Sequence, residues 1–199
     1  MKHPGMTNKV YNIPNDIFEW SEDNFKRVSK IIQKYPTSRQ QSAVIPLLDL
    51  AQRQNSGWLS KTSIEKVAET LSMSYIRVLE VATFYSMFIL EPIGENFVQI
   101  CRTTPCWLRG SDKLVKVARE ISNAKLGETS KDKKFTVVEV ACLGACCNAP
   151  MVQINDDYYE DLDESTFKKI LTDLKNNKSI SKGSQIGRQA SHHERGKDA

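Results

Sequence analysis

The chain has 199 residues, 40% of them hydrophobic and 26% charged, which is enough to bury a core in one or two domains and excludes disorder throughout. The longest apolar run, residues 81–90, is interrupted by Thr83 and Ser86. This run is far shorter than the roughly 20 residues of a membrane-spanning helix, so any membrane association should come through a partner.

The formal charge of +4 is concentrated at the C-terminus. From Lys175 onward there are six Lys or Arg and two Asp or Glu, so residues 1–174 sum to zero. Residues 179–199 are therefore expected to be a flexible basic tail, and residues 1–14 a flexible N-terminus. A solvated extension is preferred over a nucleic-acid or lipid contact because the charge is sparse, and no nucleic acid is expected as a partner.

Histidine occurs only at His3, His192 and His193, so the body of the chain has none. This excludes Ser-His and Cys-His nucleophile pairs, a Rieske centre and mixed Cys/His zinc sites there, and no catalytic residue is assigned. The first ten residues lack the features of a secretory signal or transit peptide, so a reducing, intracellular compartment is expected. The five cysteines should then be ligands or redox groups rather than disulfides.

Residues 15–93 contain no cysteine and are predicted to form a helical bundle. Apolar residues at a period near 3.6 define a first helix that ends at Pro36: Phe18, Phe25, Val28, Ile32 and Tyr35. A second helix is expected over residues 42–54, and a third after a capping box of Thr62 and Glu65.

A fourth helix is expected over residues 74–88. Its apolar residues, among them Ile76, Phe84 and Phe88, surround most of the cylinder. Burial within this chain is therefore expected on both sides of the helix, with another subunit as the alternative cover.

Residues 94–178 change to a period of two and are predicted to form a small α/β domain. The expected order is a strand, a helix started by Ser111, two strands and a turn into residues 158–159, then a helix capped by Asp163. The strands are predicted over residues 97–101, 135–141 and 151–154. The chain as a whole is thus expected to be α+β, a helical bundle followed by an α/β domain.

The cysteines follow the pattern Cys101-x4-Cys106, then 35 residues, then Cys142-x3-Cys146, with Cys147 next to the last. Each pair comes just after a predicted strand. If these two strands are parallel neighbours, both loops emerge at the same edge of the sheet and four thiolates can converge.

Four converging thiols have three plausible uses. A dithiol oxidoreductase needs a Cys-x-x-Cys spacing, which is absent. A structural zinc site usually takes tight two-residue spacers, whereas a [2Fe–2S] cluster is larger and suits wider loops. An iron–sulfur site is therefore preferred, while zinc and unrelated buried or redox-sensing thiols stay open.

Cys146 is preferred over Cys147 as the fourth thiolate because its spacing from Cys142 places it around Gly144. Cys147 is then expected to be a small buried side chain. The reverse assignment would give four spacer residues in both loops and also stays open.

Four sequence runs resemble one family of respiratory complex I (NADH-quinone oxidoreductase) components, the E-subunit family, which includes the 24-kilodalton mitochondrial subunit. They are CRTTPCWLRGS, VEVACLGACCNAPMVQINDDYYEDL, SAVIPLLDLAQRQNSGWLS and VLEVATFYSMF. The resemblance covers about residues 15–178 and implies a helical bundle followed by a thioredoxin-like [2Fe–2S] ferredoxin domain. It implies one [2Fe–2S] cluster whose metal ligands are Cys101, Cys106, Cys142 and Cys146. Ala141 stands where the family often has Glu, which affects local polarity and not ligation.

The resemblance further implies an electron-transfer subunit that exchanges an electron with the flavin of the NADH-oxidising subunit. FMN and NADH would be bound by that partner, because this chain has no glycine-rich dinucleotide fingerprint, and the chain would not be catalytic on its own. The implied partners are this FMN/NADH-binding subunit and the rest of the peripheral arm. The implied location is the cytoplasmic side of a bacterial inner membrane, or the matrix side in an organelle.

A cluster held by four thiolates carries a formal charge of about −2, which makes Arg102 and Arg109 candidates for compensating it. The alternative is that both arginines face solvent. Two other functions stay open: a diaphorase subunit of an NAD-linked hydrogenase or formate dehydrogenase, and a zinc-stabilised adaptor module.

Overall fold

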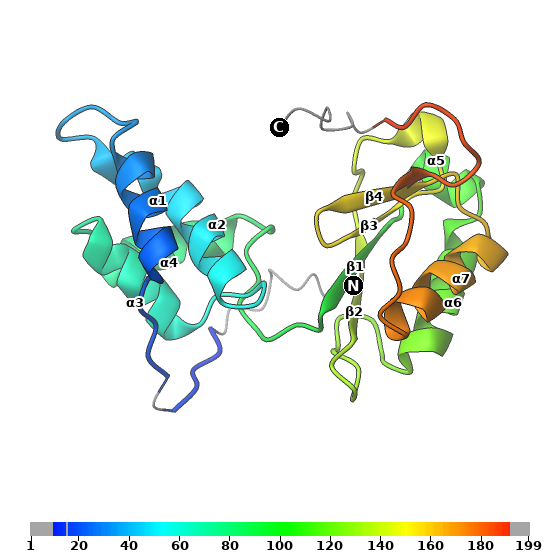
Figure 1. Cartoon of the computed structure of the whole chain (residues 1–199), viewed down its shortest axis with the longest axis horizontal. Coiled ribbons are helices and arrows are strands. Elements are labelled where there is room, and N and C mark those ends of the chain that lie inside the picture. The colour runs from blue at the N-terminus through cyan, green and yellow to red at the C-terminus, as the bar shows by residue number, and fades with distance from the viewer. Residues whose placement is uncertain (1–9, 15, 192–199) are drawn as a thin grey trace. The chain divides into compact units, whose positions relative to one another are not determined.

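The computed structural model describes residues 10–14 and 16–191, and these residues divide into two compact units between Pro92 and Ile93. The first unit is helical and the second is built on a sheet (Figure 1). The three histidines, His3, His192 and His193, lie outside the described residues. Within the described ranges, none of the helices combines the length and apolar character needed to cross a membrane.

The first unit consists of short helices, as the sequence predicts. They are α1 (Glu22–Ile32), the 3-10 turn η2 (Gln40–Ala43), α2 (Val44–Gln54), α3 (Lys61–Thr70) and α4 (Tyr75–Phe84). Serine side chains cap two of these helices. The Ser21 hydroxyl accepts from the Asn24 amide at 3.3 Å, and the Ser60 hydroxyl accepts from the Ser63 amide at 3.2 Å.

The predicted capping box of Thr62 and Glu65 is wrong. Because Ser60 is the N-cap, Thr62 already lies inside the first turn of α3, where its hydroxyl donates to Asp16. Glu65 instead forms an ion pair with Lys61 across one turn of the same helix.

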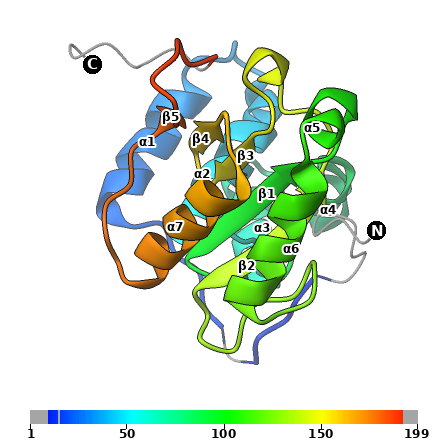
Figure 2. The same ribbon diagram turned by 90° about the vertical axis from the view of Figure 1, so that its right-hand side faces the viewer.

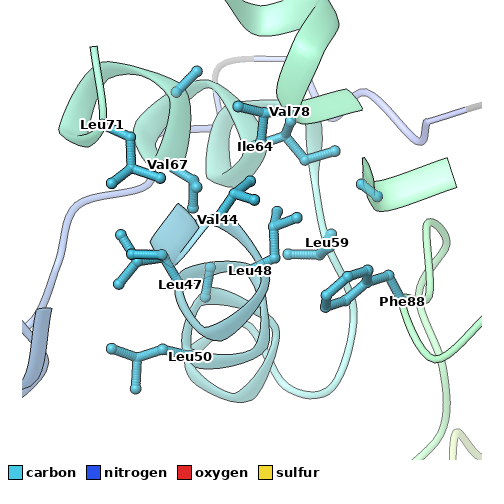
Figure 3. Close-up of a cluster of buried hydrophobic side chains, with 14 of the residues drawn as sticks. Val44, Leu47, Leu48, Leu50, Leu59, Ile64, Val67, Leu71, Val78 and Phe88 are labelled. Carbon is cyan, nitrogen blue, oxygen red and sulfur yellow. The ribbon is translucent and has the colours of Figure 1, made fainter. Parts of the chain in front are cut away.

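The core of the first unit is aliphatic and lies between α2, α3 and the segments that follow them (Figure 3). Leu47 and Leu48 of α2 pack with Ile64 of α3, and all three are fully buried. Leu59 and Phe88 reach the same core from outside the helices.

The fourth helix is shorter than predicted and less buried. It ends at Phe84 because Tyr85 adopts an extended conformation, so Phe88 enters the core from an irregular segment. Only Val78 and Ala82 of α4 are buried, whereas Ile76 and Phe84 are exposed. Within the first unit, α4 is therefore covered on one side and exposed on the other.

The second unit begins with a strand and carries a five-stranded sheet. Its elements are β1 (Asn96–Cys101), α5 (Thr104–Leu108), α6 (Ser111–Ser122), β2 (Phe135–Val140), η3 (Cys146–Asn148), β3 (Val152–Ile154), β4 (Asp157–Glu160), α7 (Glu164–Lys175) and β5 (Gly183–Ser184). The strand order is β2-β1-β3-β4-β5. β1 runs parallel to β2 and antiparallel to β3, β3 runs antiparallel to β4, and β4 runs parallel to β5.

Helices α6 and α7 lie side by side along the sheet (Figure 2). Leu114 and Ala118 of α6 share a buried cluster with Phe167 and Leu171 of α7 and with Val98 of β1. The prediction that Asp163 caps the last helix is confirmed, because its carboxylate accepts from the Thr166 amide at 2.7 Å.

The described part of the predicted solvated tail is not an extension. Residues 183–184 form β5, where Tyr159 pairs with Gly183 and Glu160 with Ser184. Residues 183–191 of this segment are instead held by hydrogen bonds to the sheet and to neighbouring side chains. We call residues 183–191 the C-terminal strap.

Candidate metal centre

The two strands that precede the cysteine pairs lie next to each other and run in the same direction. Cys101, at the end of β1, is in register with Val140, at the end of β2. The Arg102 amide donates to the Val140 carbonyl at 3.0 Å and extends this pairing by one residue. Both cysteine loops therefore leave the sheet from adjacent positions at the same edge.

The first loop is a short helix, whereas the sequence suggested an irregular loop. Pro105 lies in the first turn of α5, where its fixed φ angle fits and its missing N–H costs no hydrogen bond. Cys106 follows in this helix and is buried, as is Cys101. The Cys101 sulfur lies 3.3 Å from the Thr103 hydroxyl oxygen.

The second loop bends back at Gly144, whose φ of +89° is a conformation that glycine adopts without steric cost. The Gly144 amide donates to the Cys142 sulfur at 3.4 Å. The sulfurs of Cys142 and Cys146 are also 3.4 Å apart. The spacing of three residues thus brings both thiols to one side of this turn.

A small buried cluster joins the two loops. Cys101 and Cys106 pack with Ala145, Ala149 and Met151, which come from the second loop and the residues after it. Leu143 and Tyr158 border the cluster, and the Tyr158 hydroxyl donates to the Leu143 carbonyl at 2.7 Å. Cys101 and Cys106 therefore lie inside the site, whereas Cys142 and Cys146 are exposed.

The two thiols of each pair differ in acidity. Burial raises the pKa of Cys106 to about 12. Burial also acts to raise the pKa of Cys101, but hydrogen bonds from the Thr103 hydroxyl and amide outweigh it, so this pKa is lowered. In the second loop, the Gly144 amide lowers the pKa of Cys142, and the hydrogen bond to Cys142 raises the pKa of Cys146.

These interactions also connect the two pairs to each other. The charge of Cys101 raises the pKa of Cys146, and hydrogen bonds from Thr103 and Cys101 add to the lowering of the Cys142 pKa. Thiols ligate metals as thiolates, so a group that bound all four would have to displace their protons.

Cys147 is exposed, and the expectation that it is a small buried side chain is wrong. It follows Cys146 in the 3-10 turn η3, where successive side chains point roughly 120° apart. The buried positions next to Cys101 and Cys106 are occupied by Ala145 and Ala149, not by Cys147.

The two arginines near Cys101 and Cys106 do not provide an unpaired positive charge directed at the cysteines. Arg102 forms ion pairs with Asp112 and Glu139, and its guanidinium donates to the Ser111 hydroxyl. Arg109 is exposed. The solvent-facing alternative therefore holds for Arg109, while Arg102 is neutralised by two carboxylates.

The donor set of this site suits an iron–sulfur cluster. It offers four thiols, a backbone amide directed at one of the sulfurs and an apolar floor, and sulfur ligands favour such clusters and zinc. Among the described residues, no group of three or more His, Cys, Asp or Glu side chains is arranged to hold a metal ion.

Two contributors to this site were missed by the sequence reasoning. Thr103 follows Cys101 by two residues, and its hydroxyl was a detectable signal beside a candidate ligand. Tyr158 was placed only at the end of a turn, because its hydrogen bond to the Leu143 carbonyl joins residues fifteen positions apart.

This sheet and its two cysteine loops define a class of protein. The family model described as thioredoxin-like [2Fe–2S] ferredoxin matches residues 28–175. The chain therefore belongs to the thioredoxin-like [2Fe–2S] ferredoxin family.

Relatives narrow this class. The chain is 55% identical over 159 residues to the E subunit of the NADH-quinone oxidoreductase of Rickettsia prowazekii, covering 80% of this chain and 90% of the relative. It is 50% identical over 180 residues to the mitochondrial NADH dehydrogenase [ubiquinone] flavoprotein 2 of Dictyostelium discoideum, covering 90% and 73%. The resemblance to the E-subunit family is thereby confirmed.

The fold is also similar to part of an NAD+-reducing [NiFe]-hydrogenase in the H2-reduced state. The TM-score is 0.59 at 18% identity, over 67% of this chain and 22% of the hydrogenase chain. This likeness concerns the fold alone.

Proposed function

We propose that this chain is the electron-transferring E subunit of an NADH-quinone oxidoreductase. The observation that carries the proposal is the pair of cysteine loops at one edge of a thioredoxin-like sheet, in a chain that is 55% identical to a relative of that name. The chain contributes to an oxidoreductase complex and does not catalyse turnover by itself.

The proposed ligands are Cys101 and Cys106 from the first loop and Cys142 and Cys146 from the second. When bound, one [2Fe–2S] cluster supplies one-electron redox chemistry. The Gly144 amide and the Thr103 hydroxyl stabilise negative charge on the sulfurs they contact. Tyr158 holds the second loop by its hydrogen bond to Leu143.

The proposed partner is the subunit that binds FMN and NADH, within a peripheral arm on the cytoplasmic or matrix side of the membrane. The names of the relatives support membership of a multi-subunit NADH-oxidising complex. We assign residues 15–93 to the helical domain and residues 94–178 to the cluster domain, and we add the strap, residues 183–191, to the cluster domain.

A second candidate is the diaphorase subunit of an NAD-linked hydrogenase, which the hydrogenase-like fold favours. Purification of the complex from the native cell distinguishes the two, because the co-purifying subunits differ. The zinc-stabilised adaptor is tested by iron and acid-labile sulfide analysis of the purified chain.

The ligand assignment predicts unequal effects of two serine substitutions. Cys142→Ser should lose most of the bound iron, because an alcohol is a far weaker ligand for iron than a thiolate. Cys147→Ser removes a thiol of the same loop and exposure, and it should keep near wild-type iron and the same EPR spectrum after reduction with dithionite. Equal iron loss from both variants, or loss only from Cys147→Ser, contradicts the assignment.

A further inference from the structure

The C-terminal strap lies against the residues that follow the second cysteine loop. Its first residues pair with β4, and the Gln185 amide donates to the Glu160 carbonyl at 3.0 Å. The Ser184 hydroxyl donates to the Asp161 carboxylate at 2.6 Å. This pairing places the rest of the strap within reach of η3, which begins at Cys146 (Figure 2).

Arg188 connects the strap to the cysteine loop. Its Nη2 atom donates to the Cys147 carbonyl at 2.8 Å and to the side-chain oxygen of Asn148. The same guanidinium forms an ion pair with Asp161, at 2.9 Å from Nη2 to Oδ1. The Asp161 side chain is only 5% exposed, so it orients the guanidinium toward the loop.

Asn148 is the point in η3 where the contacts converge. Its side-chain nitrogen donates to the Glu160 carboxylate at 2.6 Å and to the Gln189 carbonyl at 2.8 Å. Its backbone carbonyl accepts from the Asp161 amide at 2.8 Å. Asn148 is buried, and its amide group is held by Arg188 and Gln189 of the strap and by Glu160 of β4.

Glu160 accepts hydrogen bonds from both the strap and the cysteine loop and so links the two. It is fully buried, and its carboxylate accepts from Asn148, from the Ser191 amide at 3.1 Å and from the Ser191 hydroxyl at 2.7 Å. A buried carboxylate that loses its donors is strongly destabilising. Removal of the strap would deprive Glu160 of Ser191 and deprive Asn148 of Arg188 and Gln189.

We infer that the strap fixes the position of the loop that carries Cys142 and Cys146, with Arg188 as a positioning residue for the cluster. The inference rests on the proposed function, because it takes these two cysteines as ligands. Groups that orient metal ligands from behind affect metal affinity without touching the metal.

The test uses the full-length chain with Arg188→Ala, Arg188→Lys and a control, Lys182→Ala. Lys182 is a positively charged residue immediately before the strap and forms an ion pair with Asp157. Among the described residues, no contact links it to the cysteine loop. Loss of iron to a chelator should be faster in Arg188→Ala by on the order of 10-fold to 100-fold, with a changed EPR line shape of the reduced cluster. Lys182→Ala should behave as the wild type.

The Arg188→Lys variant distinguishes an effect of the guanidinium geometry from an effect of the positive charge alone. Lysine keeps the positive charge beside Asp161 but lacks the planar fork that bonds Asp161 and the loop together, so it should restore iron retention only in part. Full restoration by lysine, or equal acceleration in Lys182→Ala, overturns the inference.

Hydrogen exchange of the same chains without cluster tests the strap independently of the ligand assignment. Arg188→Ala should speed exchange of the amides in residues 142–149 and leave β1 and β2 unchanged. Uniformly faster exchange across the second unit would show general destabilisation and overturn the inference. If the wild-type chain holds no [2Fe–2S] cluster, the proposed function fails, whereas the exchange contrast still decides whether the strap holds the loop.

Discussion

Asp163 shows how one side chain fixes the start of an element. Its carboxylate accepts from the Thr166 amide and from the Ser165 hydroxyl at 2.9 Å, so α7 begins at Glu164. The Asx-type cap was readable from sequence because its partners are two and three residues away. The hydrogen bond from the Thr166 amide lowers the pKa of Asp163.

Asp163→Ala should lower the free energy of unfolding of the second unit by about 1 kcal/mol at neutral pH. Since the folded-state pKa is depressed, the stabilisation is present above the unfolded value of roughly 3.9 and is lost as the pH falls through the folded pKa. The difference between variant and wild type should therefore shrink in acid. Urea denaturation followed across this pH range measures it.

Lys169→Ala, an exposed change in the same helix, serves as the control and should alter stability by less than about 0.5 kcal/mol at either pH. A difference between Asp163→Ala and wild type that stays constant into acid would show that the carboxylate does not act as the cap.

At the scale of elements, the helices of the first unit are held by packing more than by their own length. α2, α3 and α4 have ten or eleven residues each, too few to be stable alone in water. The segment after α4 also contributes to this core, because Phe88 lies beside Leu48 and Leu59 (Figure 3).

Phe88→Ala should destabilise the first unit by about 3–5 kcal/mol, because it leaves a cavity in a closed core. Phe25→Ala makes the same substitution at a side chain that is 61% exposed, and should cost far less. Hydrogen exchange of the α2 and α3 amides measures both, and suits a chain of two units better than a single unfolding transition. Similar acceleration in the two variants would contradict the described core.

The periodicity of apolar residues predicted the long helices and missed the shortest elements. α6 and α7 have twelve residues each, so their apolar faces repeat several times. α5 has five residues and β5 has two, which is too short for any period to show. The error at α4 has a different cause, since the apolar pattern continues past Phe84 while the backbone leaves the helix.

At the scale of the whole molecule, the chain provides one part of a redox pathway. It contains no glycine-rich fingerprint for a dinucleotide, and its described elements form a helical unit and a thioredoxin-like unit. The role proposed for it therefore needs a second subunit to supply electrons from NADH.

The purified chain, loaded with its cluster, should not consume NADH when an artificial electron acceptor is present. Addition of the co-purified FMN-containing subunit should start consumption, and dithionite should reduce the isolated chain directly. The loss of NADH absorbance and the bleaching of the visible spectrum measure these outcomes. NADH consumption by the chain alone would contradict the proposed division of roles.

The sequence by itself predicted that the chemistry depends on sulfur, and it predicted the class of fold. Cysteine spacing, the absence of histidine between His3 and His192 and the change from helical to alternating period are local properties, and they predicted a helical part followed by a sulfur-rich α/β part. The family resemblance added the thioredoxin-like fold and the cofactor, and named the four ligands that remain to be tested.

Only the tertiary structure decided which segments meet. The parallel pairing of β1 and β2 brings together two loops 35 residues apart, and Arg188 reaches a carbonyl 41 positions earlier in the chain. No local pattern encodes such contacts, because they depend on sheet order and on where a buried carboxylate such as Glu160 finds its hydrogen-bond donors. For the same reason a segment that reads as a polar tail becomes, in the folded chain, a support for the cysteine loop.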